Sequence, residues 1–183
     1  MQFCGLTIAF ALLLAQPPEP VFINAPYVPS SDKVVSAMLK LAAVNSSDSV
    51  YDLGCGDGRI VVAAAKDFGA HGVGIDINPV RIAEAKENAR KAAVESLVRF
   101  EENDLFRADI HEASVVTIFL LSDINLKLRP KLLRDLKPGT RLVSNTFDMG
   151  DWKPDKEAIV DTDNQDDSLS HRLYMWVIPE RRP

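Results

Sequence analysis

Residues Ser49–Arg59 of this 183-residue chain read Ser-Val-Tyr-Asp-Leu-Gly-Cys-Gly-Asp-Gly-Arg. The first five residues are typical of a short buried strand, and the glycines that follow mark a tight turn that opens a helix. Gly54 and Gly56 permit left-handed backbone angles and the close approach of a ligand to the main chain, while Gly58 lets the helix lie tight against the strand. The stretch therefore predicts a loop that binds a nucleotide-like cofactor.

The charge of this loop narrows the class of cofactor. Its spacing is Gly-x-Gly-x-Gly, unlike the Gly-x-Gly-x-x-Gly of dinucleotide folds, which brings a pyrophosphate onto a helix N-terminus. Asp52 lies two residues before Gly54, and Asp57 lies inside the loop. These carboxylates place negative charge where a diphosphate would rest, so a cationic or zwitterionic cofactor is favoured.

The loop resembles motif I of the class I methyltransferases, which bind S-adenosylmethionine. In that family the first acidic residue of the motif and the loop amides hold the methionine half of the cofactor. The resemblance therefore implies S-adenosylmethionine as the cofactor and assigns contacts with it to Asp52, Gly54, Gly56, Asp57 and Gly58.

Composition indicates a globular domain of ordinary size. With 46% hydrophobic and 26% charged residues, the chain can bury one sizeable core. A net charge of -5 disfavours general affinity for nucleic acid, which needs a basic face. Cys4 and Cys55 supply neither a disulfide framework nor the spacing of a metal site, so no metal is predicted.

Residues 1–20 differ from the rest of the chain. The run Gly5–Ala15 is apolar, and the proline-rich segment Gln16–Pro20 then interrupts any helix. The run is short for a bilayer span and lacks the basic start of a secretory signal. A signal or membrane-targeting segment and a segment that packs on the domain both stay open, and a cytoplasmic or membrane-associated location is favoured. Residues 21–183 are predicted to form a single methyltransferase domain.

The remaining pattern predicts strands that alternate with helices. Predicted strands cover residues 49–53, 72–77, 98–103, 115–121 and 141–147, and predicted helices cover 31–44, 59–68, 79–92 and 122–136. Pro130 is expected to kink or restart the last helix. Two strand-like runs at 157–160 and 172–178 predict a terminal antiparallel hairpin. The expected architecture is an α/β, Rossmann-like, doubly wound sheet of five parallel strands covered on both faces, plus this hairpin.

Acidic residues also lie at the carboxyl ends of the second and third predicted strands. Asp76, with Ile77 beside it, lies where a carboxylate can accept hydrogen bonds from the two hydroxyls of a ribose. Asp104 and Leu105 follow the third strand, where the resemblance to class I methyltransferases implies a carboxylate on the adenine amino group and a backbone amide on its ring. Ligands of parallel sheets bind at the carboxyl ends of the strands, so these residues are expected to share one edge.

Other residues are expected at the same edge. They are Tyr27, the turn Ser122–Asn125 and the segment Asn145–Phe147, and each also has a purely structural interpretation. His71 and His111 precede strands and therefore fall on the opposite edge. His171 begins the last strand and can reach the active edge, although packing is the commoner role for a lone histidine in a hairpin.

Three further blocks carry a closer resemblance. Pro26–Ser30, Tyr51–Ile60 and Leu136–Arg141 resemble the protein-lysine methyltransferases that modify the ATP synthase c subunit and the adenine nucleotide translocase. The resemblance implies a lysine side chain as acceptor. It also implies that Tyr27 and Ser30 help to close the cofactor and substrate pocket, and that the apolar N-terminus serves membrane targeting.

Methyl transfer fits a chain without a nucleophile triad or a metal cluster, because the cofactor carries the reactivity and the protein aligns the reactants. Asp123 and Asn125 are predicted to orient a neutral amine on the rim of the site. Leu120–Asp123 stands where base-modifying methyltransferases carry an Asp/Asn-Pro-Pro-Tyr/Phe motif, which disfavours a nucleobase substrate. A small-molecule methyltransferase and a non-catalytic S-adenosylmethionine-binding module are the alternatives, and a nicotinamide-dependent oxidoreductase is disfavoured by the loop spacing.

Overall fold

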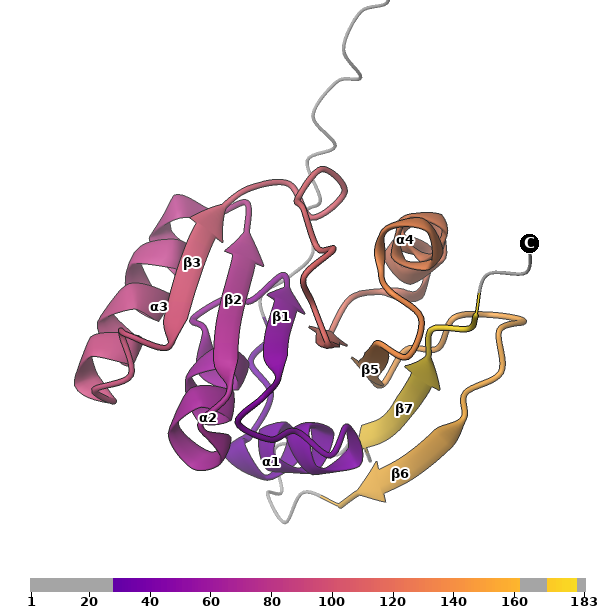
Figure 1. Cartoon of the computed structure of the whole chain (residues 1–183), viewed down its shortest axis with the longest axis horizontal. Coiled ribbons are helices and arrows are strands. Elements are labelled where there is room, and N and C mark those ends of the chain that lie inside the picture. Colours follow the sequence, from indigo (N-terminus) through magenta and orange to yellow (C-terminus); the bar gives the residue numbers. More distant parts are fainter. Residues whose placement is uncertain (1–27, 162–170, 181–183) are drawn as a thin grey trace, which may run out of the picture.

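A computed structural model describes residues 28–161 and 171–180 and contains one seven-stranded sheet in the order β3-β2-β1-β4-β5-β7-β6 (Figure 1). The strands are β1 Ser49–Leu53, β2 His71–Asp76, β3 Val98–Glu102, β4 Val115–Ile118, β5 Arg141–Asn145, β6 Lys156–Val160 and β7 His171–Val177. The helices are α1 Asp32–Leu41, α2 Arg59–Phe68, α3 Pro79–Lys91 and α4 Ser122–Asp135. Tyr27, the apolar N-terminal segment and the polar loop 162–170 lie outside the described residues.

The predicted fold class is confirmed. Strands β1 to β5 pair in parallel, β7 pairs antiparallel with β5, and β6 pairs antiparallel with β7. The bounds of β1 and α2 are those predicted from the glycine-rich stretch. Helix α4 runs through Pro130, and β4 and β5 end earlier than predicted, at Ile118 and Asn145.

The connection between β3 and β4 contains no helix, and none of the predicted helices lies between these strands. Residues 103–114 form a loop without a helix, and its apolar side chains Leu105 and Ile110 enter the main core in place of a helix. The buried Lys131 of α4 fixes this loop, because its Nζ donates to the Ala108 carbonyl at 2.6 Å and to Asp135 at 2.7 Å. This loop therefore packs against Val73 and Ile75 of β2 in the main core.

Two apolar layers hold the sheet. On one face, α4 and the 103–114 loop pack on the central strands through Ile124, Leu128 and Leu132. On the other face, α1 and α2 bury Val34, Met38 and other side chains against the sheet. Among the described residues, no helix has the length and apolar character needed to cross a membrane.

The parallel arrangement gathers the carboxyl ends of β1 to β5 at one edge, which is the upper edge for β1, β2 and β3 in Figure 1. Five parts of the chain lie at this edge, each at or just after the end of a strand. They are the glycine loop, Asp76, Asp104, Phe119 and the turn after β5. We call this the carboxyl edge, and its opposite the amino edge.

Gly58 shows how tightly this edge is built. It is the N-cap of α2, with φ of 76°, and an added Cβ would lie 2.6 Å from Phe100 and 2.8 Å from Ala85. Gly139 also has a positive φ, of 84°, but an added Cβ there meets nothing within 4 Å.

We therefore predict that Gly139→Ala lowers the free energy of unfolding by about 1–2 kcal/mol through backbone strain alone. Gly58→Ala should lose about 1–3 kcal/mol more, because the methyl group also overpacks the site. Urea denaturation of both variants measures the difference. Equal losses would show that packing at Gly58 is unimportant.

Candidate active site

The glycine loop is held against the end of β2 by backbone bonds. The amides of Gly54 and Cys55 donate to the Ile75 carbonyl at 2.8 and 3.0 Å, and the Gly56 amide donates to Asp76 Oδ2 at 2.9 Å. Asp76 Oδ1 accepts from Asn78 N–H at 2.9 Å. Each carboxylate oxygen has more than one lone pair, so Asp76 keeps capacity for the hydroxyl groups of a ligand.

Asp52 is a buried carboxylate beneath the loop. Its side chain accepts a hydrogen bond from the Thr117 hydroxyl at 2.8 Å, and the residue is only 3% exposed. Burial raises the pKa of Asp52 to about 7, the Thr117 bond opposes the rise, and the charges of Asp76 and Asp57 add to it. A cationic group placed near Asp52 would stabilise its ionised form.

Cys55 lies in the same loop and is also buried. Burial, and next the charge of Asp52, raise the pKa of the Cys55 thiol far above its ordinary value. A thiol in this state is a poor nucleophile.

Asp57 is paired within the protein rather than directed at a ligand. Arg59 contacts both of its carboxylate oxygens, at 2.9 and 2.7 Å, and also donates from Nη1 to the Ser30 carbonyl at 2.7 Å. Ser30 in turn accepts a hydrogen bond from Asn145 Nδ2 at 3.2 Å. The segment 28–31 therefore runs from the glycine loop to the end of β5, and Arg59 connects Asp57 to it.

The third acidic position lies after β3. Asp104 Oδ1 accepts from Phe106 N–H at 2.9 Å, and Asp104 lies 3.8 Å from Arg107. Leu105 is buried in the core, whereas the Ile77 side chain is 43% exposed at the end of β2. The structure thus brings Asp52, Asp76 and Asp104 to the ends of three neighbouring strands.

The two residues predicted to orient the substrate lie in different surroundings. The Asp123 side chain is exposed and lies 3.6 Å from Lys127. Asn125 is fully buried, unlike the rim position expected from the sequence, because it lies on the inner face of α4. Its Nδ2 donates to the carbonyls of Phe147 and Asp148 at 3.2 and 3.3 Å, and its Oδ1 has no partner among the described residues. Asn125 therefore supports the chain after β5 from beneath.

His171 lies at the carboxyl edge, as the sequence allows. This side chain is 5% exposed, and its Nδ1 lies 3.0 Å from Asn145 Oδ1 at the carboxyl edge. Its place at the start of an antiparallel strand indicates this edge. The burial of its side chain depends on how β7 pairs with β5, which the sequence does not show.

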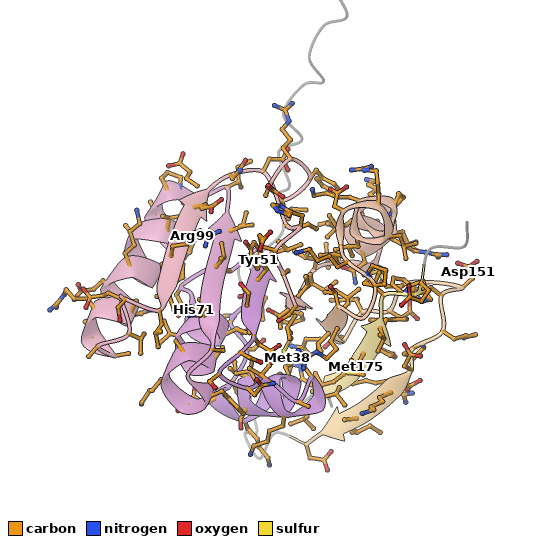
Figure 2. All side chains as sticks on the ribbon, viewed as in Figure 1. Met38, Tyr51, His71, Arg99, Asp151 and Met175 are labelled. Atoms are coloured by element: carbon orange, nitrogen blue, oxygen red, sulfur yellow. The ribbon has the colours of Figure 1, made fainter. Side chains whose placement is uncertain are left out.

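A cavity of about 400 Å³ lies at the opposite edge of the sheet. Its lining includes Tyr51, His71 and Arg99, which Figure 2 shows over strands β1 to β3, and Arg99 Nη2 donates to the Tyr51 hydroxyl at 3.1 Å. We place the active site at the carboxyl edge, because the glycine loop and the three carboxylates are there and ligands of parallel sheets bind there. Among the described residues, no group of three His, Cys, Asp or Glu side chains is arranged to hold a metal ion.

Comparison with known proteins assigns the chain to a family. Residues 52–156 match the model of the ANTKMT methyltransferase domain. The chain belongs to the ANTKMT methyltransferase family. The match spans the glycine loop, all three carboxylates, α4 and β5 of this ANTKMT-family protein.

Individual relatives agree with the family assignment. A protein-lysine N-methyltransferase of Saccharolobus islandicus is 47% identical over 160 residues, which cover 87% of this chain and 97% of that protein. The adenine nucleotide translocase lysine N-methyltransferase of Mus musculus is 32% identical over 135 residues, which cover 74% of this chain but only 58% of that protein. The chain thus matches little more than half of the mouse protein.

A solved structure is similar over nearly its whole length. The crystal structure of an RNA methyltransferase from Salinibacter ruber in complex with S-adenosyl-L-homocysteine has 50% sequence identity and a TM-score of 0.77. It covers 85% of this chain and 97% of its own. The class I methyltransferase fold of this ANTKMT-family protein is therefore confirmed.

The raised pKa of Asp52 predicts a specific pH dependence of stability. The carboxyl group binds its proton near pH 7 in the folded state but near 3.8 when unfolded, so between these values the folded state holds more protons and its stability falls as pH rises. Asp52→Asn should remove this fall and raise the free energy of unfolding at about pH 8, by up to about 1.4 kcal/mol for each unit of pKa displacement.

Urea denaturation at about pH 5 and about pH 8 tests this. Asp67→Asn, at an exposed position of α2, is the matched control and should change little at either pH. Equal effects of Asp52→Asn at both pH values would contradict the buried-charge account.

Proposed function

We propose that this chain transfers the methyl group of S-adenosylmethionine to a lysine side chain of a protein, at the carboxyl edge. The row of carboxylates Asp52, Asp76 and Asp104 around the glycine loop carries this proposal, because it suits a cofactor with cationic and hydroxyl groups and no phosphate. The S-adenosyl-L-homocysteine in the Salinibacter ruber structure supports the same cofactor.

Each cofactor contact has a proposed residue. Asp52 would stabilise the cationic end of the methionine half, Gly54 and Gly56 would let it approach the loop backbone closely, and Gly58 would support this contact by keeping α2 packed behind the loop. Asp76 would accept the ribose hydroxyls. Ile77 offers apolar surface to the adenine, and Asp104 and the Leu105 amide would contact its edge. Asp57 acts through Arg59, and Tyr27 is proposed to close the site from the N-terminal side.

When bound, the cofactor supplies a methyl group on a positively charged sulfur. The protein has to hold an acceptor nitrogen in line with that methyl group and keep it unprotonated. Asp123 is exposed on the rim, where a carboxylate can accept a hydrogen bond from the amine while water takes the proton. We propose that Asn125 contributes from beneath, by holding the Phe147 and Asp148 carbonyls.

Charge at this edge favours a cationic acceptor. Asp52, Asp57, Asp76, Asp104 and Asp123 are acidic, and Arg59, Arg107 and Lys127 lie against three of them, so among these residues the carboxylates outnumber the basic groups. A lysine ammonium is attracted to such an edge, and a phosphate backbone is repelled by it. RNA is the second candidate acceptor, because the Salinibacter ruber relative is named an RNA methyltransferase.

Calorimetry tests the cofactor half of the proposal. We expect micromolar binding of S-adenosylmethionine and S-adenosylhomocysteine, a binding free energy of about -8 kcal/mol, and no binding of NAD. Asp76→Ala should weaken binding by about tenfold or more, since it removes an acceptor for the ribose, while the exposed Asp67→Ala should not. Absence of binding of both sulfur ligands would overturn the proposal.

A methyl-transfer assay tests the acceptor half. Lysine-containing peptides and membrane-protein fragments are compared with total RNA, using a cofactor labelled on the methyl group. We expect label on lysine, located by mass spectrometry of the digested acceptor. Label on RNA alone would replace the lysine assignment with the second candidate.

The domain division is part of the same proposal. We propose that residues 21–183 form the catalytic domain and that residues 1–20 attach it to a membrane or target it. Co-sedimentation with lipid vesicles should be lost on deletion of residues 1–20 while cofactor binding is kept. Equal sedimentation of both forms would contradict the attachment role.

A further inference from the structure

The chain leaves β5 through an unusual turn. Thr146 has φ of 66°, and the Phe147 amide donates to the Asn145 carbonyl at 2.8 Å, which closes a three-residue γ-turn. Positive φ is rare for a β-branched residue, and turns of this kind are strained. Such strain persists only where the surroundings enforce it, and it is commonest at functional sites.

Several buried groups hold this turn. The Thr146 amide donates to the Arg172 carbonyl of β7 at 2.8 Å, and Ser144 Oγ donates to the Phe147 carbonyl at 2.5 Å. Asn125 Nδ2 bonds the same Phe147 carbonyl from α4. Strand β7 and helix α4 thus fix the backbone after β5 from two sides.

The turn places Phe147 in a group of three rings. Phe147 stacks on Phe119 with ring centroids 6.3 Å apart and an interplanar angle of 27°, and Phe119 meets His171 edge-on at 6.2 Å and 71°. Phe119 and Phe147 are partly exposed, and the rings follow β4, follow β5 and begin β7. We call Phe119, Phe147 and His171 the aromatic cluster.

Hydrogen bonds fix the orientation of the His171 ring. Its Nδ1 lies 3.0 Å from Asn145 Oδ1, and because an amide oxygen only accepts, Nδ1 is assigned the hydrogen. Asn145 is itself buried and donates to Ser30 Oγ at 3.2 Å. The aromatic cluster is therefore connected to the segment 28–31 that reaches the glycine loop.

The aromatic cluster lies beside the proposed cofactor site, on the side away from the nucleoside carboxylates. Leu120, the residue after Phe119, lies 3.1 Å from the position a Cβ would take on Gly54. Asp76 and Asp104 belong to β2 and the end of β3, on the other side of β1 in the sheet order. The side of the glycine loop nearest β4 and β5, where the cluster lies, is therefore separate from Asp76 and Asp104 and is open to an acceptor.

We propose that the aromatic cluster contacts the acceptor and makes the enzyme specific for an alkylammonium side chain; this rests on the proposed function. Ring faces attract a cation, and the methylene groups of a lysine side chain pack against aromatic surface. After water has taken one proton, the nitrogen lone pair forms the bond to the methyl carbon. The carbon–sulfur bond breaks with its electron pair going to sulfur, and the methylated nitrogen carries the positive charge.

Phe147→Leu and His171→Gln test this proposal with matched controls at the amino edge. Phe68→Leu and His71→Gln make the same chemical changes, at the end of α2 and the start of β2. The Michaelis constant for a lysine peptide should rise by about tenfold in both cluster variants, and the dissociation constant of S-adenosylhomocysteine should stay within about twofold of wild type. Both controls should behave as wild type.

The possible outcomes distinguish failure of the aromatic-cluster assignment from failure of the proposed function. Retained binding of S-adenosylhomocysteine shows that a variant is folded. If wild type methylates lysine and the cluster variants keep its Michaelis constant, the cluster assignment is wrong and the proposed function stands. The assignment is also wrong if cofactor affinity falls in step with acceptor use. If wild type binds the cofactor but methylates no lysine, the proposed function fails and the cluster assignment fails with it.

Discussion

The site depends on how the glycine loop is tied to β2. Two loop amides share the Ile75 carbonyl and a third binds Asp76, so the turn after β1 has its shape only when β2 is paired beside it. This arrangement turns an irregular loop into a fixed cradle. The Asp76 carboxylate has two roles in it: it supports the loop through the Gly56 amide, and it keeps lone pairs that can accept hydrogen bonds from a ligand.

The buried negative charge at the carboxyl edge lowers the stability of the folded protein without its cofactor. Asp52 is buried with Asp76 and Asp57 nearby, and the Thr117 hydroxyl is the group that opposes the rise of its pKa most strongly. A carboxylate in such a place destabilises the folded chain at neutral pH unless a cation reaches it. If the positively charged cofactor binds beside Asp52 as proposed, binding would relieve this cost and would link cofactor affinity to stability through the same residue.

The parts of the site that the sequence predicted are those carried by local pattern. The Gly54–Gly58 spacing and the carboxylates at the ends of the first three strands need only the rule that parallel strands share an edge. Asn125 was predicted on the rim but is buried. Its burial depends on which face of α4 turns toward the sheet, and the expected kink at Pro130 left that face undetermined. His171 and the Thr146 turn depend on the pairing of β5 with β7, which joins residues about 26 positions apart in the chain. The predicted hairpin consists of β6 and β7, and local pattern does not show which of its strands lies beside β5. The path of the loop between β3 and β4 likewise depends on long-range contacts with Lys131 of α4.

The central claim is that the carboxyl edge, and not the cavity at the opposite edge, receives the cofactor. Amide hydrogen exchange with and without S-adenosylhomocysteine tests it most directly. We predict slower exchange in the ligand-bound protein at Gly54–Gly58, Ile77 and Leu105, with unchanged exchange at His71 and Ser96–Val98. Slower exchange confined to His71 and Ser96–Val98 would contradict the account.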